Sequence, residues 1–454
     1  MKNFALKSSK VITSDGMGPC CVEIKHGLIH ALHDVGKSLD CPIEDLGDLV
    51  LMPGLVDSHV HINEPGRTEW EGFNTATQAA AAGGITTLVD MPLNCIPVTT
   101  TKAAFMEKLE AVKDKLWVDC GFWGGVIPDN IEQLDELLCS GVLGVKSFLI
   151  DSGIAEFPKV DANHIRLAMP IIAKHGVPYL IHAELDCNGE SEVDIGNSYQ
   201  KFLASRPKKW ENDAVQMMID LATESYDKGN NIKVHVVHLS SDEALEKITK
   251  AKQDGLEFTA ETCPHYLTLE AEQIPDGKTL FKCCPPIREN KNREHLWQAL
   301  KQGVISFIVS DHSPCTPQLK NIDSGDIEKA WGGISALQFG LPLIWTEARQ
   351  RDFTLEDISK LMSLETAKFA GLDKIKGKIA EGYHADLLVF DEQASFTISN
   401  EMIKHRHKIT PYVGREVQGK IIKTFVRGQL VFSGDDFIGI PSGQVLLKNE
   451  PIKI

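Results

Sequence analysis

Short, nearly continuous apolar segments alternate with amphipathic segments through the middle of the chain. Apolar segments bounded by turn residues predict buried strands, and amphipathic segments predict helices. The predicted strands cover residues 49–62, 85–91, 118–124, 144–149, 178–183, 233–239, 257–263 and 305–311. The clearest predicted helices cover residues 71–82, 101–115, 162–175, 212–227, 242–254 and 294–302. This alternation indicates an α/β fold with parallel strands, and eight such units favour a closed (β/α)8 barrel over an open sheet.

The two ends of the chain have a different pattern. Short strand-like runs separated by Gly and Asp turns cover residues 10–14, 21–25, 28–33, 385–390, 419–427 and 429–432. Gly428 lies between the last two runs, as expected for a hairpin turn. We predict that residues 1–50 and 380–454 form one small β domain and that residues 51–379 form the barrel. Two separate β appendages are the alternative.

The charge balance argues against some classes of partner. Lys and Arg number 47 and Asp and Glu 63, giving a net charge of −16. Such an excess repels phosphate backbones and anionic lipid, so we expect neither nucleic-acid nor membrane binding. The eleven cysteines contain no CxxC pair, which is typical of reduced thiols, and no secretory signal is visible. The cytoplasm is therefore the expected compartment.

The end of the first barrel strand contains a possible metal site. Side chains two positions apart in a strand share a face, so His59 and His61 point the same way, as does Asp57. The carboxyl ends of barrel strands are where catalytic groups lie. Two imidazoles on one face can bind a transition metal, but two histidines with other partners would give the same pattern.

Three further strands end in residues of metal-ligand type, namely His182, His238 and Asp311. Packing alone rarely places such residues at four separate strand ends, so the metal interpretation gains support. His235 is three positions before His238, takes the opposite face, and is excluded as a ligand.

Lys146 lies among apolar residues of the fourth predicted strand. Burying an unpaired ammonium there is costly, and it would repel nearby metal ions. Two solutions remain open: an ion pair, or reaction of the amine with CO2 to give an anionic carbamate.

These residues resemble the binuclear cyclic amidohydrolases, a family that includes dihydroorotases, hydantoinases and allantoinases. The resemblance covers nearly the whole chain. Its motifs are residues 53–61, 61–72, 91–94, 261–266, 309–315 and 329–333, and in detail they are most similar to the allantoinase branch.

The resemblance implies a distorted barrel with a small β-sandwich formed by both termini, and two divalent metal ions per subunit, with zinc expected. One ion would bind His59, His61 and Asp311, and the other His182 and His238. Carboxylated Lys146 would bridge them, and Asp57 could orient a ligand imidazole from behind.

The resemblance also implies a reaction: hydrolysis of the hydantoin-ring amide of allantoin to allantoate, in purine degradation. A hydroxide that bridges the metals would attack, with Asp311 as general base and then acid. Dihydroorotases carry an Arg where this chain has Asn63, and an amide suits the neutral ureido arm of allantoin better. Asn94 and the backbone of Cys284 are expected substrate contacts, and a homotetramer is expected.

Two rival functions stay open. The chain could be a hydantoinase or dihydroorotase that opens a related cyclic amide. A rival of another class is a non-catalytic scaffold, which would lack metal ligands, whereas all six expected positions are filled here.

Overall fold

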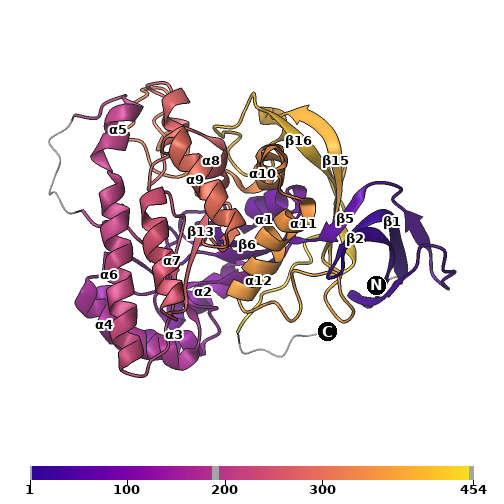
Figure 1. Cartoon of the computed structure of the whole chain (residues 1–454), viewed down its shortest axis with the longest axis horizontal. Helices are drawn as coiled ribbons and strands as arrows, with labels where there is room; N and C mark the ends of the chain where they lie inside the picture. Colours follow the sequence, from indigo (N-terminus) through magenta and orange to yellow (C-terminus); the bar gives the residue numbers. More distant parts are fainter. Residues whose placement is uncertain (1–2, 187–193, 449–454) are drawn as a thin grey trace.

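Parallel strands surrounded by helices form the body of the molecule in the computed structural model, which describes residues 3–186 and 194–448 (Figure 1). These strands pair in chain order as β6-β7-β8 and β9 to β14. They are β6 (Leu55–Val60), β7 (Ile85–Asp90), β8 (Asp119–Phe122), β9 (Gly124–Gly125), β10 (Val145–Phe148), β11 (Pro178–His182), β12 (Lys233–Val236), β13 (Phe258–Thr262) and β14 (Phe307–Ile308). After β14, His312 forms a parallel bridge to Val60 and accepts a hydrogen bond from His61 N at 2.8 Å. The last strand segment therefore meets the first, and the predicted barrel fold is confirmed.

Helices follow the barrel strands and cover their outer side, with α4, α6 and α7 on the flank far from the chain termini (Figure 1). They are α1 (Phe73–Ala82), α2 (Lys102–Ala111), α3 (Leu134–Cys139), α4 (Ala162–His175), α5 (Tyr199–Ser205), α6 (Lys208–Asp227), α7 (Leu245–Gln253), α8 (Pro264–Thr268), α9 (Asn290–Lys301), α10 (Gly340–Ala348), α11 (Leu355–Ser359) and α12 (Glu365–Phe369). Within the described ranges, no helix has both the length and the apolar character needed to span a bilayer.

Helix α4 illustrates how local sequence sets these elements. The Asp161 side chain caps its start by accepting hydrogen bonds from the backbone N–H groups of Asn163 and His164. Gly176 ends it at a φ of 62°, a left-handed conformation that glycine adopts without steric cost. Ile165 and Ile172, seven positions apart, lie on the buried face that packs toward the barrel.

One predicted strand, residues 49–62, is two strands in the structure. Gly54 separates β5 (Val50–Pro53) from β6, and its N–H donates to Asp386 O at 2.8 Å. A Cβ at position 54 would lie 2.3 Å from the Thr86 side chain, so a glycine is required for this close approach. The sequence pattern did not reveal the break at Gly54, because both strands are buried and their apolar character is continuous.

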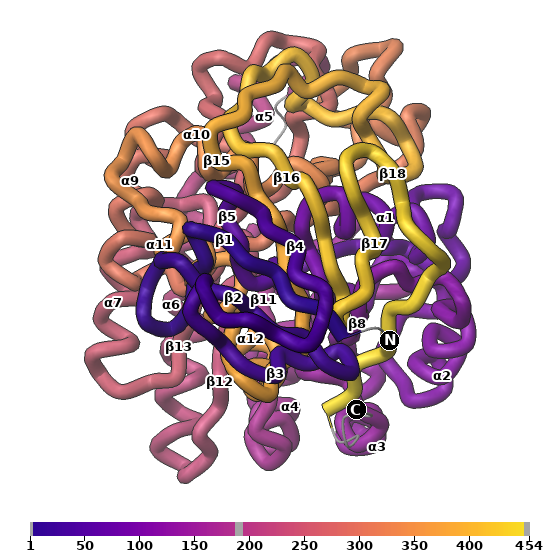
Figure 2. Tube along the Cα trace, turned by 90° about the vertical axis from the view of Figure 1, so that its right-hand side faces the viewer, coloured from indigo at the N-terminus to yellow at the C-terminus, as the bar shows by residue number. Residues whose placement is uncertain are grey.

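Both ends of the chain contribute to one sheet, the terminal sheet, in the order β18-β17-β16-β15-β5-β1-β2-β3, with β4 beside β1 (Figure 2). Its other strands are β1 (Phe4–Thr13), β2 (Gly16–Lys25), β3 (Leu28–His33), β4 (Ile43–Asp45), β15 (Leu387–Thr397), β16 (Glu416–Val426), β17 (Gln429–Ser433) and β18 (Asp436–Phe437). N-terminal and C-terminal material meet where β5 pairs antiparallel with β15. The predicted division into domains at residues 50 and 380 remains a prediction.

A buried ionic cluster joins the terminal sheet to the barrel. Lys376 Nζ lies 2.6 Å from the Asp119 carboxylate of β8 and also pairs with Asp386, just before β15. Arg427, just after β16, pairs with Asp119 and donates its backbone N–H to Asp386 at 2.7 Å. Two carboxylates and two cations thus neutralise one another between the two parts.

Candidate metal centre and active site

His59, His61 and Asp311 converge at the carboxyl end of the barrel. The Oδ1 atom of Asp311 lies 3.2 Å from His59 Nε2 and 3.6 Å from His61 Nε2. All three side chains are buried, and one possible ligand atom from each lies within 4.8 Å of the others. Two imidazole nitrogens and a carboxylate oxygen at this spacing fit a divalent transition metal.

A second pair of histidines lies beside the first group. His182 ends β11 and His238 follows β12, and their ring centroids are 4.6 Å apart. The His238 ring is also 5.4 Å from the His59 ring. Phe148 stacks on His182 at 4.4 Å and limits its rotation. The four histidines expected from the sequence as ligands are therefore brought together.

Lys146 lies between the two groups. Its Nζ is 3.3 Å from His59 Nε2 and 5.1 Å from the centre of the Phe148 ring, and the side chain is fully buried. In residues 3–186 and 194–448, no carboxylate lies within 4.0 Å of this ammonium. Lys146 thus has no direct carboxylate contact in these residues, although the nearby Asp311 and Glu261 carboxylates favour its charged form and raise its pKa against the effect of burial.

Burial sets the protonation of the site. It lowers the pKa of His59, His61 and His238 well below the ordinary value, and the nearby Lys146 ammonium lowers all three further. Neutral imidazole is the form that binds metals. Burial also lowers the pKa of Lys146 to about 8 and raises that of Asp311 to about 8, the latter against the attraction of Lys146.

Glu261, at the end of β13, supports the first histidine from behind. Its Oε1 hydrogen bonds with His59 Nδ1 and accepts the backbone N–H of His238 at 3.3 Å, and its Oε2 lies 3.0 Å from His235 Nε2. With Nδ1 engaged by the carboxylate, His59 Nε2 is left for a metal. The sequence interpretation gave Glu261 no role, although an acidic residue inside an apolar strand was a signal for a buried partner.

Asp57 acts on the backbone and not on an imidazole, contrary to expectation. Its carboxylate accepts the N–H of His59 at 3.1 Å and that of Ser310 at 3.1 Å. Asp57 thereby links the first strand to the segment that carries Asp311. Side-chain alternation correctly put Asp57 on the face of His59, but it could not show which atoms the carboxylate reaches.

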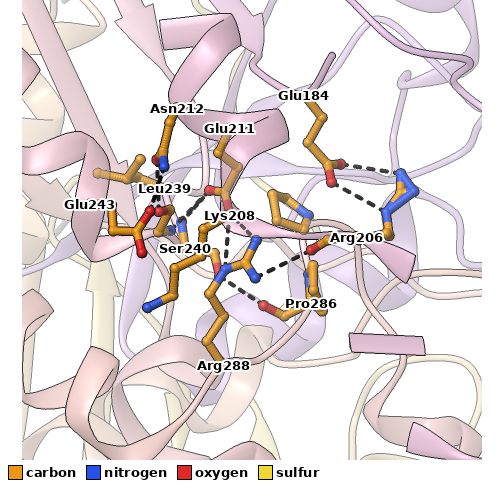
Figure 3. A network of polar contacts seen from close by, with 12 residues as sticks. Glu184, Arg206, Lys208, Glu211, Asn212, Leu239, Ser240, Glu243, Pro286 and Arg288 are labelled. Carbon is orange, nitrogen blue, oxygen red and sulfur yellow. Dashed lines mark hydrogen bonds and ion pairs between the residues drawn. The ribbon is translucent and has the colours of Figure 1, made fainter. Parts of the chain in front are cut away.

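A second acidic residue, Glu184, supports His182 and pairs with Arg206, a contact drawn in Figure 3. Its Oε2 lies 2.7 Å from His182 Nε2, and both oxygens accept hydrogen bonds from Arg206 at 3.2 Å. Arg288 continues the network: it pairs with Glu211 at 2.6 Å and donates to the Arg206 carbonyl at 3.3 Å. Arg288 therefore has a structural role in this network, and the sequence interpretation gave Glu184 and Arg206 no role.

A pocket of about 290 Å³ opens onto this centre. Both expected substrate contacts, Asn94 and Cys284, line it with His61, His182, His238 and Asp311. Arg67 donates to the Asn94 carbonyl at 2.8 Å and so holds that segment in place.

Asn63 does not reach this pocket, in contrast to the expectation that its amide faces the ureido arm. Asn63 is buried, is not among the described residues that line the pocket, and donates through Nδ2 to Pro314 O at 3.2 Å. Its φ of 66° shows that the chain has left the strand conformation, so alternation no longer predicts where its side chain points.

Three site residues have left-handed backbone conformations: Asn94, His238 and Asp311, with φ of 65°, 40° and 43°. Such conformations cost non-glycine residues about 1–2 kcal/mol each and are concentrated at functional sites. The strain indicates that the surrounding structure fixes these side chains in position.

A larger cavity, of about 1100 Å³, lies at the opposite end of the barrel. Its lining includes Pro178, Lys233, Phe258 and Phe307, the first residues of β11 to β14, and none of the expected metal ligands. Five of the expected metal ligands, His61, Lys146, His182, His238 and Asp311, line instead the smaller pocket at the carboxyl ends of the strands.

Comparisons with known proteins agree with this geometry. The model of the Amidohydrolase family matches residues 50–431. An allantoinase from Streptomyces avermitilis is 47% identical over 451 residues, 99% of each chain. An allantoinase from Saccharomyces cerevisiae is 44% identical over 449 residues, covering 98% of this chain and 96% of its own. An L-hydantoinase (dihydropyrimidinase) structure from Arthrobacter aurescens has a TM-score of 0.90 at 27% identity, covering 98% of this chain and 100% of that one.

Proposed function

The chain belongs to the amidohydrolase family, and on that premise we propose that it is an allantoinase, which hydrolyses the hydantoin-ring amide of allantoin to allantoate. The observation that carries the proposal is the convergence of His59, His61 and Asp311 beside Lys146, at a pocket that His61, Lys146 and Asp311 line, in a chain similar to allantoinases over its whole length. A cyclic amide is a poor electrophile, and such a site can activate both water and the amide carbonyl.

We propose that two divalent metal ions bind here, with zinc as the expected metal. His59, His61 and Asp311 would hold one, and His182 and His238 the other. Carboxylated Lys146 would hold both, which is supported by its complete burial without a carboxylate partner in the described residues. When bound, the ions would lower the pKa of water toward ~7 and polarise the amide carbonyl.

The protein's own groups would then handle the proton. Asp311 would accept a proton from the attacking water and deliver it to the ring nitrogen as the carbon–nitrogen bond breaks. Its carboxylate is well placed because its Oδ1 faces both His59 and His61. Of the two protons of the water, one passes through Asp311 to the ureido nitrogen and the other is released when the new carboxyl group ionises, so a single residue serves as base and then acid.

Asn94 and the backbone of Cys284 are the proposed substrate contacts. Both line the pocket, and the Asn94 segment is held by the hydrogen bond from Arg67. An amide and a peptide group offer both donors and acceptors, which suits the uncharged carbonyl and N–H groups of allantoin.

The test is ring opening of allantoin, hydantoin and dihydroorotate by one preparation of metal-loaded protein. We expect the highest kcat/KM for allantoin, and a His59→Ala, His61→Ala double variant should reduce the rate to background. A higher kcat/KM for hydantoin would overturn the assignment in favour of the rival that the fold similarity supports.

Elemental analysis separates the enzyme from a non-catalytic scaffold. We expect about two metal ions per chain after purification with the metal present, and loss of turnover after treatment with a chelator. A protein without stoichiometric metal, or one that kept its full rate with a chelator present, would contradict the metal-dependent mechanism.

The homotetramer is also a proposal, and light scattering on the 50.1 kDa chain would test it: a mass about four times that of the chain is expected. The cytoplasmic compartment remains a prediction from the sequence.

A further inference from the structure

Lys320 is a buried lysine that the reaction described above does not use. It lies in the loop after Asp311, and only 3% of its surface is exposed. In residues 3–186 and 194–448, no carboxylate lies within 4.0 Å of its Nζ. Burying an ammonium costs several kcal/mol unless strong interactions offset the loss of water.

The Lys320 ammonium instead donates to three backbone carbonyls. Its Nζ lies 3.0 Å from Lys282 O and 2.9 Å from Trp331 O, and it also bonds with Gly333 O. Three charge-assisted hydrogen bonds use all the donors of an ammonium. Burial lowers the pKa of Lys320 to about 8, so the ammonium is still the main form at pH 7.

The three carbonyls belong to two segments that form one wall of the active-site pocket. Residues 282–284 and 329–333 all line that pocket, whereas Lys320 does not. The segments also contact each other directly, because Gly333 N donates to Lys282 O at 2.9 Å. The Lys320 ammonium therefore lies behind the wall and fastens its two halves together.

This wall has no room for a side chain at position 333. A Cβ on Gly333 would lie 2.4 Å from Ser313 O, whereas one on Gly332 would make an ordinary contact 3.4 Å from Cys284 Sγ. Both glycines line the pocket, and Lys320 holds the Trp331 and Gly333 carbonyls on either side of Gly332.

We propose that Lys320 is a positioning residue for substrate binding: it fixes the peptide groups of residues 282–284 and 331–333 so that they can hydrogen bond with the cyclic amide. Lys320 touches neither the substrate nor the metal ligands. That the substrate is allantoin rests on the proposed function. The hydrogen bonds by which Lys320 holds the wall do not depend on it.

The kinetic test uses metal-loaded Lys320→Met and Lys320→Arg, with Lys278→Met as a matched control on an exposed lysine of the preceding loop. We expect Lys320→Met to raise KM for allantoin at least tenfold, with a smaller change in kcat and unchanged metal content. Lys320→Arg should recover part of the loss, because it keeps the charge but not the three-donor geometry. A KM within twofold of wild type in Lys320→Met would overturn the proposal. A rise in KM accompanied by loss of metal would also overturn it.

Hydrogen exchange gives a readout that needs no substrate and applies to whichever variant folds. Amides of residues 282–284 and 329–333 should exchange faster in both Lys320 variants, while those of the metal-ligand strands should not change. Equal exchange in the wall, or faster exchange throughout the barrel, would contradict a local positioning role. Failure of wild-type protein to open allantoin would instead count against the proposed function alone.

Discussion

The Nδ1 atom of His59 hydrogen bonds with Oε1 of Glu261, so the opposite ring nitrogen faces Asp311. Glu184 bonds to the Nε2 atom of His182, which leaves Nδ1 of that ring free of the carboxylate. The two acidic residues thus select opposite nitrogens in the two ligand groups. With one nitrogen of each ring bonded to a carboxylate, the other nitrogen is left as the possible metal ligand.

Glu261→Gln should weaken metal binding while leaving the fold intact, because a neutral amide of similar shape replaces the carboxylate behind His59. We expect roughly a 10–100-fold loss of affinity, the range typical of residues that orient metal ligands. Metal content after dialysis at a fixed free-metal concentration measures the effect. Glu257→Gln, on the exposed side of the same segment, is the matched control, and equal metal retention by both variants would refute the role of Glu261.

Asp311→Asn should abolish turnover of allantoin. The amide cannot accept the proton of water, and loss of a positioned general base alone costs roughly 10²–10⁴-fold in rate. Steady-state kcat and metal content should both fall, because the same carboxylate is a proposed ligand. Asp151→Asn changes another carboxylate of the pocket and should leave most activity. Near wild-type activity in Asp311→Asn would end its assigned role.

Lys146→Ala should lose metal and activity together, since it removes the group that lies between the two histidine pairs, 3.3 Å from His59 Nε2. Short carboxylic acids such as acetate or propionate should restore part of the rate by supplying the missing carboxylate oxygens. Titration of the variant with each acid, with chloride as the salt control, measures this rescue. A fully active Lys146→Ala enzyme would show that the bridge is wrong.

Asp119→Asn should destabilise the protein at neutral pH by about 3–5 kcal/mol, because it leaves Lys376 and Arg427 buried with one carboxylate fewer. Burial alone would raise the pKa of Asp119, but the two cations lower it to about 2. Since an unfolded Asp titrates near ~3.9, this stabilisation is present above about pH 4 and is lost as pH falls toward about 2.

Urea unfolding of wild type and Asp119→Asn across this pH range checks the effect. The difference in unfolding free energy should shrink as pH falls from about 4 to about 2. Asp15→Asn, in an exposed turn, should stay within about 0.5 kcal/mol of wild type throughout. A difference that did not change with pH would mean that the charge of Asp119 does not stabilise the fold.

The sequence was sufficient to predict the barrel and the grouping of its ligands, because period-two alternation and the polarity of parallel strands are local rules. His59, His61 and His182 lie where alternation placed them. Glu261 could not be paired with His59 in the same way, since 202 residues separate the two. Asn63 was misplaced because the chain leaves the strand just before it, and alternation holds only within a strand.

The break at Gly54 was hidden for a related reason. Both flanking strands are buried on every residue, so hydrophobicity does not change where the chain passes from one sheet to the other. Only the close approach to Thr86, a tertiary contact, explains the glycine.

Strand β5 finds its partner β15 only after the ribosome has made roughly 330 further residues. At translation rates of roughly 5–20 residues per second, that delay is on the order of 20–70 s. During this interval the nascent N-terminal strands display an unprotected hydrogen-bonding edge, the kind of surface on which chaperones act and aggregates begin. The strand edge left exposed by the first fifty residues is therefore covered only when the final sixth of the polypeptide has been synthesised.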